Sequence, residues 1–567
     1  MIVGIDLGTT NSLVAVWRDD QPVLVANALG GFLTPSVVGL DDLGQVVVGE
    51  VARERLQTHP QLTTALFKRY MGSNREIRLG SRNFRPEELS ALVLKSLIAD
   101  VERAYGEPVT EAVISVPAYF SDAQRKATRN AGELAGLKVE KLINEPTAAA
   151  LSYGLHRKEE SSFLVFDLGG GTFDVSILEL FEGVMEVRAS AGDNFLGGED
   201  FDDVLVQRFV KLQGKTPGFP DANLPAIRNR LRREAQRVRH ELGSRDDSVF
   251  SLRLNDQEWS EVFTTEQLHE VAMPLLDRLR APIERALRDA SIRAADLDEV
   301  LLVGGTTRMP LLRKLTAGLF GRIPSMHLNP DEVVALGAAV QAALKARHAA
   351  LEEVVLTDVC PYSLGIEVSQ RVGSGYESGH YLPVIERNSV VPVSRVQQVH
   401  TTHPQQRQVQ VKVFQGESRL VKDNIFLGEL EIDVPPQTTG VLDLDVRFTY
   451  DINGLLEAFV SIPLTGENHS LVIENSPGAM TTEEIAQRLQ QLQSLKIHPR
   501  EQQVNSVLVA RLERLYQESL GDLRHYAGEL AQQFQQLLET QDERQIRAGR
   551  TEIAKRVDEL EKGFRGL

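Results

Sequence analysis

Apolar residues near the start and in the second quarter of the chain form short runs that end at an acidic residue. One run ends at Asp6 and another at Asp167, and each is followed by a glycine-containing turn and a second apolar run. Because β-prone runs separated by such turns are typical of hairpins, each stretch predicts a pair of antiparallel strands. The two stretches form an internal repeat, and the first copy has one residue fewer in its turn.

Both predicted turns are suited to binding phosphate. Consecutive glycines let several backbone N–H groups converge on one anion, and the acidic residue can hold a divalent cation directly or through water. An ordinary glycine-rich hairpin would explain either copy alone. The repetition favours two turns that face each other across a cleft and hold a polyphosphate with its metal. The turn residues are Gly8, Thr9, Thr10 and Asn11 in the first copy and Gly169, Gly170, Gly171 and Thr172 in the second.

The periodicity of apolar positions changes twice in the second half of the chain. From Cys360 to about Ile473, apolar and polar residues alternate in short segments, which predicts strands of a β-sandwich-like unit. Asn453-Gly454 predicts a hairpin turn within it. Beyond Pro477, apolar residues recur at spacings of three and four, which predicts helices to the end of the chain. The first of these helices is expected to begin at a capping box, Thr481 to Glu484.

Composition limits the class of protein. The chain has 567 residues, which is too long for one core and predicts about two to four domains. Its net charge of −17 opposes nonspecific binding to nucleic acid or to an anionic membrane. Cys360 is the single cysteine, so an intrachain disulfide is excluded and a reducing compartment is favoured. With no signal-like start and no apolar run long enough to span a bilayer, we expect a cytoplasmic protein.

The repeated turns resemble the phosphate 1 and phosphate 2 motifs of the actin, sugar-kinase and heat-shock ATPase superfamily. The residues of these motifs resemble those of the seventy-kilodalton heat-shock, DnaK-like chaperones in particular. The resemblance implies a multidomain fold: an α/β actin-like two-lobed ATPase at 1–350, a hydrophobic interdomain linker at 351–359, an antiparallel β-sandwich that binds peptide at 360–475, and an α-helical lid at 476–567. A trimmed region after Gly72, an altered peptide arch and the lack of a long tail resemble the HscC-like branch.

The resemblance also implies an ATPase site. The segment from Thr64 to Gly72 predicts a short helix that ends at glycine, and Lys68 within it stands at the position of the family's ATPase lysine. A lysine in so short a helical pattern is usually a solvated charge. Asp6 and Asp167 would hold Mg²⁺, with K⁺ as a further candidate ion, and hydrolysis would yield ADP and phosphate. The residues expected to act on phosphate, water and metal are Lys68, Glu145, Thr172 and Asp174.

Further loops match the family's contacts to the nucleotide. Arg308 is expected to stack on the base. Gln236 and Arg239 stand where the family usually has glutamate and lysine, on a basic helix whose charges a solvated face would also explain. This departure affects the expected affinity and exchange rate more than the identity of the nucleotide. The contacts implied outside the two turns are Gly197, Gly198, Gln236, Arg239, Gly304, Gly305, Thr306, Thr307, Arg308 and Asp331.

Communication between domains is expected through a switch and the linker. In the family, residues matching Pro117 and Glu145 report phosphate occupancy, and one matching Arg125 relays it. The proline and the glutamate would also be explained if they simply mark the end of a strand and the start of a helix. The linker residues implied are Val354, Val355, Leu356 and Asp358, in a run that could equally be one more strand.

The β-sandwich is expected to hold an extended peptide by main-chain hydrogen bonds and apolar pockets. Ser369 and Thr402 match the arch over the peptide and are smaller or more polar than the usual pair. Burial in the sandwich core is the alternative for the pocket residues, which are Ile366, Val368, Val399, Val409, Val411 and Leu455.

Taken together, the resemblance implies an ATP-driven chaperone whose ATP hydrolysis gates peptide exchange. Its expected partners are unfolded or extended polypeptides and a J-domain co-chaperone, while the need for a nucleotide-exchange factor stays open. We expect a monomer with no nucleic-acid or membrane partner. A small-molecule kinase with the same ATPase core is one alternative, and a nucleotide-gated scaffold of the actin type is another, but neither accounts for the sandwich and the lid.

Overall fold

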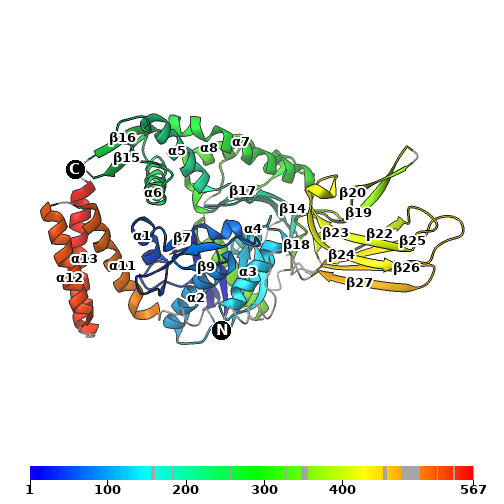
Figure 1. The fold of residues 1–567 in the computed structure, drawn as a ribbon, viewed down its shortest axis with the longest axis horizontal. Helices are drawn as coiled ribbons and strands as arrows, with labels where there is room; N and C mark the ends of the chain where they lie inside the picture. The colour runs from blue at the N-terminus through cyan, green and yellow to red at the C-terminus, as the bar shows by residue number, and fades with distance from the viewer. Residues whose placement is uncertain are drawn as a thin grey trace.

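The computed structural model describes residues 1–154, 160–181, 184–255, 257–325, 328–346, 355–373, 375–391, 393–450, 456–473, 499–519, 521–539 and 543–565. Figure 1 shows a two-lobed α/β body, coloured blue to green, in the middle of the molecule. Yellow strands lie at one end of this body, and orange and red helices lie at the other. The order of these parts in space therefore differs from their order in the sequence.

The first lobe is built on a mixed sheet with the order β11-β10-β1-β2-β3, and β4 pairs with β2. Strand β1 runs parallel to β10 and antiparallel to β2, so the predicted first hairpin is confirmed. Val3 and Ile5 are fully buried in it, and the pairing leaves Asp6 at the strand end, beside the turn. The strands are β1 (Ile2–Asp6), β2 (Asn11–Arg18), β3 (Gln21–Leu24), β4 (Thr34–Pro35), β10 (Glu111–Val116) and β11 (Lys138–Asn144).

The second lobe repeats this plan with the sheet order β17-β12-β13-β14-β18-β21. Strand β12 runs antiparallel to β13 and parallel to β17, so the second predicted hairpin is confirmed as well. The strands are β12 (Ser161–Leu168), β13 (Phe173–Phe181), β14 (Val184–Asp193), β17 (Glu299–Val303), β18 (Val355–Val359) and β21 (Val390–Val391). The two glycine turns, each preceded by an aspartate, therefore lie at equivalent ends of two related sheets.

Helices cover the sheets and join the lobes. Helices α4 and α9 pack against each other, and α9 also lies on β1 and β2. Their facing surfaces are rich in alanine, which lets the two helices approach closely. The helices of the body are α1 (Glu50–Thr58), α2 (Pro86–Tyr105), α3 (Asp122–Leu134), α4 (Glu145–Gly154), α5 (Gly198–Gln213), α6 (Pro225–Glu241), α7 (Thr265–Asp289), α8 (Pro310–Phe320) and α9 (Val333–Lys345), with 3-10 turns η2 (Ala294–Asp296) and η3 (Gly305–Arg308).

The segment around Lys68 differs from the short helix that the sequence predicted from Thr64. Strand β7 (Thr63–Ala65) pairs with β5, and only the 3-10 helix η1 (Phe67–Tyr70) follows. Leu66 between them has φ of 62°, a left-handed conformation that is costly for a branched side chain. The smaller sheets of the body are β5 (Val37–Leu40), β6 (Val46–Val48) and β7, then β8 (Ile77–Leu79) with β9 (Arg82–Phe84), and β15 (Asp247–Leu254) with β16 (Gln257–Thr264).

The alternating segments form two antiparallel four-stranded sheets that share one core, as the period-two pattern predicted. Leu364, Val413 and Val446 are fully buried or nearly so in this core, whereas the predicted Asn453-Gly454 turn lies outside the described residues. One sheet has the order β20-β19-β23-β24 and the other β22-β25-β26-β27. The strands are β19 (Leu364–Val372), β20 (Gly375–Ile385), β22 (Val393–His400), β23 (Gln408–Gln415), β24 (Ile425–Asp433), β25 (Asp443–Tyr450), β26 (Leu456–Ile462) and β27 (Glu467–Ile473), with η4 (Val421–Asp423).

The run expected to be an interdomain linker is a strand. β18 pairs in parallel with β14 through Val355, Leu356 and Thr357, and antiparallel with β21 through Asp358 and Val359. It thereby extends the sheet of the second lobe and joins it to the start of the sandwich. Val354 lies outside the described residues. The alternative interpretation of this run, one more strand, is therefore confirmed, and its role as an interdomain linker stays a prediction.

The C-terminal helices form a bundle of α11 (Pro499–Glu518), α12 (Gly521–Glu539) and α13 (Glu543–Arg565). Leu512, Phe534 and Val557 are buried in its core. Among the apolar residues that recur at spacings of three and four in this region, Leu530 and Phe534 are buried, while Leu523 and Tyr526 are substantially exposed. The predicted capping box and the first helix of this region lie outside the described residues.

The bundle packs on α1 and α2 of the first lobe, at the opposite end of the molecule from the sandwich. In Figure 1, the helices expected to be a lid therefore do not lie over the sandwich. Throughout the described part of the chain, every helix is too short or too polar to cross a lipid bilayer.

Candidate functional site

The turn between β1 and β2 touches the turn between β12 and β13 in the space between the lobes. A Cβ added to Gly170 would lie 1.8 Å from Oγ1 of Thr10, and one added to Gly171 would lie 2.6 Å from Cγ2 of Thr9. No larger side chain fits at these positions unless the opposite turn moves. The glycines of the second turn are thus required by its close approach to the first.

The loop before α5 and the loop around η3 both contact the turn between β12 and β13. The N–H of Gly198 and Oγ1 of Thr306 both donate to the carbonyl of Gly169, over 3.0 and 2.9 Å. A Cβ on Gly197 would lie 2.4 Å from the carbonyl carbon of Gly170. The structure therefore brings together the loops that the sequence predicted to contact nucleotide. The other residues predicted for these loops lie in or beside the same turns: Gly8, Asn11, Thr172, Gly304, Gly305 and Thr307.

A buried ion pair lies beside the two turns. Nζ of Lys68 donates to Oε1 of Glu145 over 2.9 Å. The lysine side chain is only 3% exposed, and its ammonium lies 5.5 Å from the centre of the Phe120 ring. Lys68 comes from η1 and Glu145 from the first residue of α4. This lysine is therefore part of the interior of the cleft and not a solvated surface charge.

The acidic side chains around this pair repel one another. Burial, followed by the charge of Glu145, raises the pKa of Asp6 to about 7 and that of Asp174 to about 7. Burial, then Glu145 and Asp174, raise the pKa of Asp167 well above its usual value. Lys68 opposes all of these shifts. The cluster carries more potential negative charge than its lysine neutralises, so a cation would stabilise the ionised carboxylates.

The residues fit magnesium when it is bound together with phosphate. Oγ1 of Thr10 and Oδ2 of Asp174 are buried and have no hydrogen-bond partner among the described residues. Within the same residues, no group of three or more histidine, cysteine, aspartate or glutamate side chains could hold a metal on its own. Magnesium retains several waters and is typically bound by one or two carboxylates plus substrate phosphates. Asp6 and Asp167 supply such carboxylates at the turns.

The region expected to bind adenosine is held by internal ion pairs. Arg239 is buried, and its Nε donates to Oδ1 of Asp202 over 2.6 Å. Arg308 is exposed and donates to Oδ2 of Asp331 over 2.7 Å, and also to Asn329 over 2.6 Å. The sequence did not single out Asp202, although it lies in the acidic first turns of α5. Gln236 lies on α6 and is partly buried.

A chain of hydrogen bonds runs from the predicted relay to β18. Arg125 donates to Oδ1 of Asn144 over 2.6 Å, and Nδ2 of Asn144 donates to Oδ2 of Asp358 over 2.6 Å. Burial raises the pKa of the Asp358 carboxyl, and the charge of Arg125 opposes that shift. Pro117 is buried nearby. Sequence reasoning missed Asn144, whose position at the end of β11 and next to Glu145 was the available signal.

A second connection was also missed. The N–H of Tyr119 donates to Oδ1 of Asp174 over 2.9 Å, while the carbonyl of Tyr119 accepts from Oη of Tyr362 over 2.9 Å. The rings of Tyr119 and Tyr362 are 4.4 Å apart. One residue of the cleft thus contacts both an acidic group of the site and the segment that leads into the sandwich.

The predicted peptide-pocket residues divide into two groups. Ile366 and Val411 are buried in the sandwich core, whereas Val368, Val399 and Val409 are partly buried against it. Burial alone therefore accounts for the first group. Leu455 lies outside the described residues.

The predicted arch residues also have defined positions. Ser369 lies where the register between β19 and β20 shifts, at a bulge. The N–H and Oγ1 of Thr402 both donate to Oε1 of Gln406, over 2.9 and 3.1 Å.

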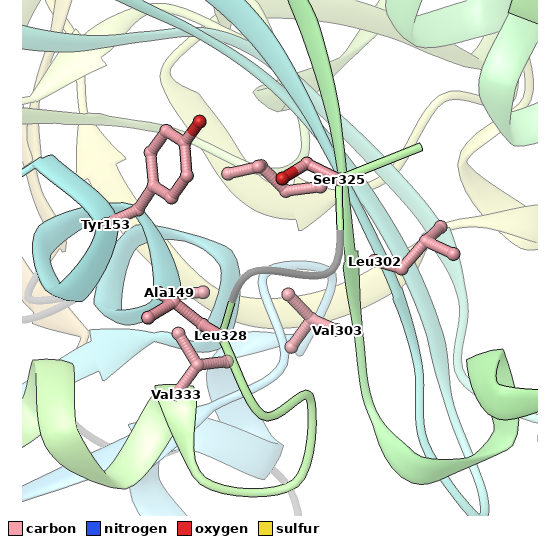
Figure 2. A pocket seen from close by; sticks show the side chains of 8 residues that line it. Ala149, Tyr153, Leu302, Val303, Ser325, Leu328 and Val333 are labelled. Atoms are coloured by element: carbon pink, nitrogen blue, oxygen red, sulfur yellow. The ribbon is translucent and has the colours of Figure 1, made fainter. Parts of the chain in front are cut away.

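A small apolar cavity lies behind the cleft, between α4, β17 and the start of α9 (Figure 2). Its volume is about 20 Å³, which is room for about one water molecule. It is therefore too small for a nucleotide. Its lining residues are Ala149, Tyr153, Leu301, Leu302, Val303, Ser325, Leu328 and Val333.

Comparison with known proteins gives consistent results. A family model described as "Hsp70 protein" matches residues 2–77 and 74–565. The chain is also 38% identical, over an alignment of 591 positions, to the "Chaperone protein dnaK3" of Thermosynechococcus vestitus. That alignment covers 96% of this chain and 85% of the relative. Both likenesses run through the lobes, the sandwich and the helical bundle.

Proposed function

The chain belongs to the Hsp70 family and is an ATP-dependent molecular chaperone of the DnaK-like type, and we propose that it hydrolyses ATP between its two glycine turns. The observation that carries this proposal is the position of the buried Lys68–Glu145 pair beside turns that touch across the lobes. Phosphates held by the turns would lie next to this pair. The two-lobed ATPase, β-sandwich and helical bundle are the parts that this family combines.

The chain supplies groups for each part of the hydrolysis. Backbone N–H groups of the two turns would bind the phosphate oxygens. Lys68 would stabilise negative charge on the phosphoryl group, and Glu145 and Asp174 would orient the attacking water. Thr172 would help to position water and metal. Magnesium, held near Asp6 and Asp167 through water or oxygen, would neutralise phosphate charge.

Two connections would report the nucleotide state to the sandwich. One runs from Arg125 through Asn144 to Asp358 on β18, and the other runs from Asp174 through Tyr119 to Tyr362. Because Asp174 lies in the cleft, a change in the bound nucleotide would alter the hydrogen bond that the N–H of Tyr119 donates to its carboxylate. We propose that the pairing of β18 with β14 represents one of two states, and that β18 is released in the other.

The sandwich would bind extended apolar segments of unfolded proteins. Val368, Val399 and Val409 are the predicted pocket residues that keep part of their surface accessible, so they are the stronger candidates for peptide contacts. A J-domain co-chaperone is the proposed partner that delivers such segments. The narrower resemblance to the HscC-like branch stays a prediction, because the relative found here is a dnaK3 chaperone.

A kinase or a scaffold is less favoured. The family match extends from residue 2 to residue 565 and includes the sandwich and the bundle, which a small-molecule kinase does not need. Product analysis would separate the classes. A chaperone releases inorganic phosphate faster when an extended apolar peptide is added, whereas a kinase places phosphate on a small acceptor.

The substitution Lys68→Ala tests the proposed chemistry. We expect single-turnover hydrolysis to fall about a hundredfold to a thousandfold, the loss seen when one group that stabilises transition-state charge is removed. Mg-ATP should still bind, as measured by calorimetry. Lys314→Ala is the matched control, because Lys314 is exposed on α8. Unchanged single-turnover hydrolysis in Lys68→Ala would remove this lysine from the mechanism.

A further inference from the structure

The residue after Lys68 also points into the cleft but contacts the other lobe. Arg69 lies on η1 of the first lobe, and its Nη2 donates to Oδ2 of Asp200 on α5 of the second lobe over 2.5 Å. Its side chain is only 13% exposed. The pair therefore bridges the lobes within the cleft.

The remaining part of the guanidinium faces the glycine turns. Nε of Arg69 is buried and has no hydrogen-bond partner among the described residues. It lies 2.8 Å from the position of a Cβ on Gly171, and Oγ1 of Thr9 lies 3.0 Å from the same position. A buried N–H donor without a partner costs free energy, because it has lost its hydrogen bonds to water. An acceptor supplied by a ligand would remove that cost.

The local backbone holds Arg69 in this position. Leu66 immediately before η1 adopts a left-handed conformation, with φ of 62°. Gly72 after η1 has φ of 73°, and a Cβ there would lie 2.7 Å from the backbone of Ala123 and Gln124 on α3. Backbone strain of this kind persists where the surrounding structure fixes it, often at functional sites. The guanidinium is thus placed before any ligand arrives.

We propose that Arg69 is a nucleotide-binding residue that donates from Nε to a phosphate oxygen of ATP while Nη2 stays on Asp200. An arginine suits this role because its planar guanidinium presents donors in more than one direction at once. Bound phosphate then becomes a third partner in the bridge between η1 and α5. ATP binding and closure of the lobes are thereby coupled through one side chain. This inference rests on the proposed ATPase site.

The test compares Arg69→Met with Asp200→Asn. If Nε binds phosphate, calorimetry should show about a tenfold to hundredfold loss of Mg-ATP affinity in Arg69→Met, the effect of losing a hydrogen bond to a charged group. Asp200→Asn should lose less, because the phosphate contact remains. Arg69→Lys should bind Mg-ATP more tightly than Arg69→Met, since lysine keeps the positive charge but lacks the several donors of the planar guanidinium.

Arg75→Met provides the matched control, because Arg75 is exposed and stacks on Tyr70 with its guanidinium 3.8 Å from the ring centre. Equal losses in Arg69→Met and Asp200→Asn would show that Arg69 only anchors α5, and that would overturn the inference. Unchanged affinity in Arg69→Met would overturn it too. Failure of the unmodified protein to bind Mg-ATP would instead refute the proposed ATPase site.

Discussion

The two-lobed body contacts the β-sandwich and the helical bundle through very different kinds of interface. On the sandwich side, β18 pairs through its main chain with β14 and β21, and the Arg387–Asp289 ion pair lies beside this pairing. On the bundle side, ion pairs join α1 to α11: Arg514 lies 2.9 Å from Glu54, and Arg55 lies 3.8 Å from Glu513. The first interface therefore fixes register and direction, and the second depends on charge.

The interfaces also differ in how they are connected to the proposed ATPase site. The sandwich side is connected to Asp174 through Tyr119, by hydrogen bonds of 2.9 Å on either side of that residue. The bundle side reaches the cleft at its outer edge, where Glu54 also lies 3.7 Å from Arg233 on α6 of the second lobe. A change at the phosphates would thus be transmitted to the sandwich through these hydrogen bonds. It would be transmitted to the bundle through a change in the position of one lobe relative to the other.

The largest effect is expected from breaking the main-chain pairing. Proline lacks the N–H that a sheet needs, and successive N–H groups of a strand point to opposite sides. A Val355→Pro/Leu356→Pro variant should therefore lose a hydrogen bond to β14 and abolish stimulation of the ATPase by peptide. The measurement is steady-state phosphate release with and without an apolar peptide. Val355→Ala/Leu356→Ala is the control that retains the N–H groups, and full stimulation in the proline variant would contradict docking through this strand.

A smaller effect is expected from the ion pair that flanks the same interface. Nε and Nη2 of Arg387 donate to Asp289 over 2.8 and 3.0 Å, at the end of α7. A double-mutant cycle with Arg387→Ala and Asp289→Ala should give a coupling of about 0.5–3 kcal/mol. The readout is hydrogen exchange of the β18 amides, which should become less protected. The equivalent cycle at Arg293 and Asp296, an exposed pair outside the interface, should not affect these amides, and equal effects at both sites would contradict a role in docking.

The bundle interface should respond to salt where the sandwich interface does not. At about 1 M salt the screening length is about 3 Å. The ion pairs between α1 and α11 are largely buried and are screened less than exposed pairs would be, so they should weaken modestly while main-chain pairing persists. Hydrogen exchange in α1 should rise with salt, and exchange in β18 should stay nearly constant. Arg514→Ala should produce the same rise in α1 at low salt. Equal salt sensitivity of α1 and β18 would show that the two interfaces do not differ in this way.

The local pattern of the chain was sufficient for the hairpins and the sandwich strands. Asp6 and Asp167 each end an apolar run before glycine, and strands with buried alternate residues follow from period-two patterning. The converging loops could be anticipated because each carries glycines where backbone must approach backbone. The segment after Thr64 was misjudged as a short helix, because pairing of β7 with β5 overrides the weak helical preference of so short a stretch.

Other features depend on residues far apart in the chain, which no local pattern records. The contact of Arg239 with adenosine stays a prediction. Its pairing with Asp202 was not anticipated, because only the packing of α5 beside α6 brings the two together. The link from Asn144 to Asp358 and the pair of Arg69 with Asp200 are of the same kind. The sequence predicted a helical bundle but not the surface it occupies, because an amphipathic helix specifies that one face is covered and not by what. The surface that the bundle occupies includes opposite charges on α1 and α11, which become neighbours only in the folded chain.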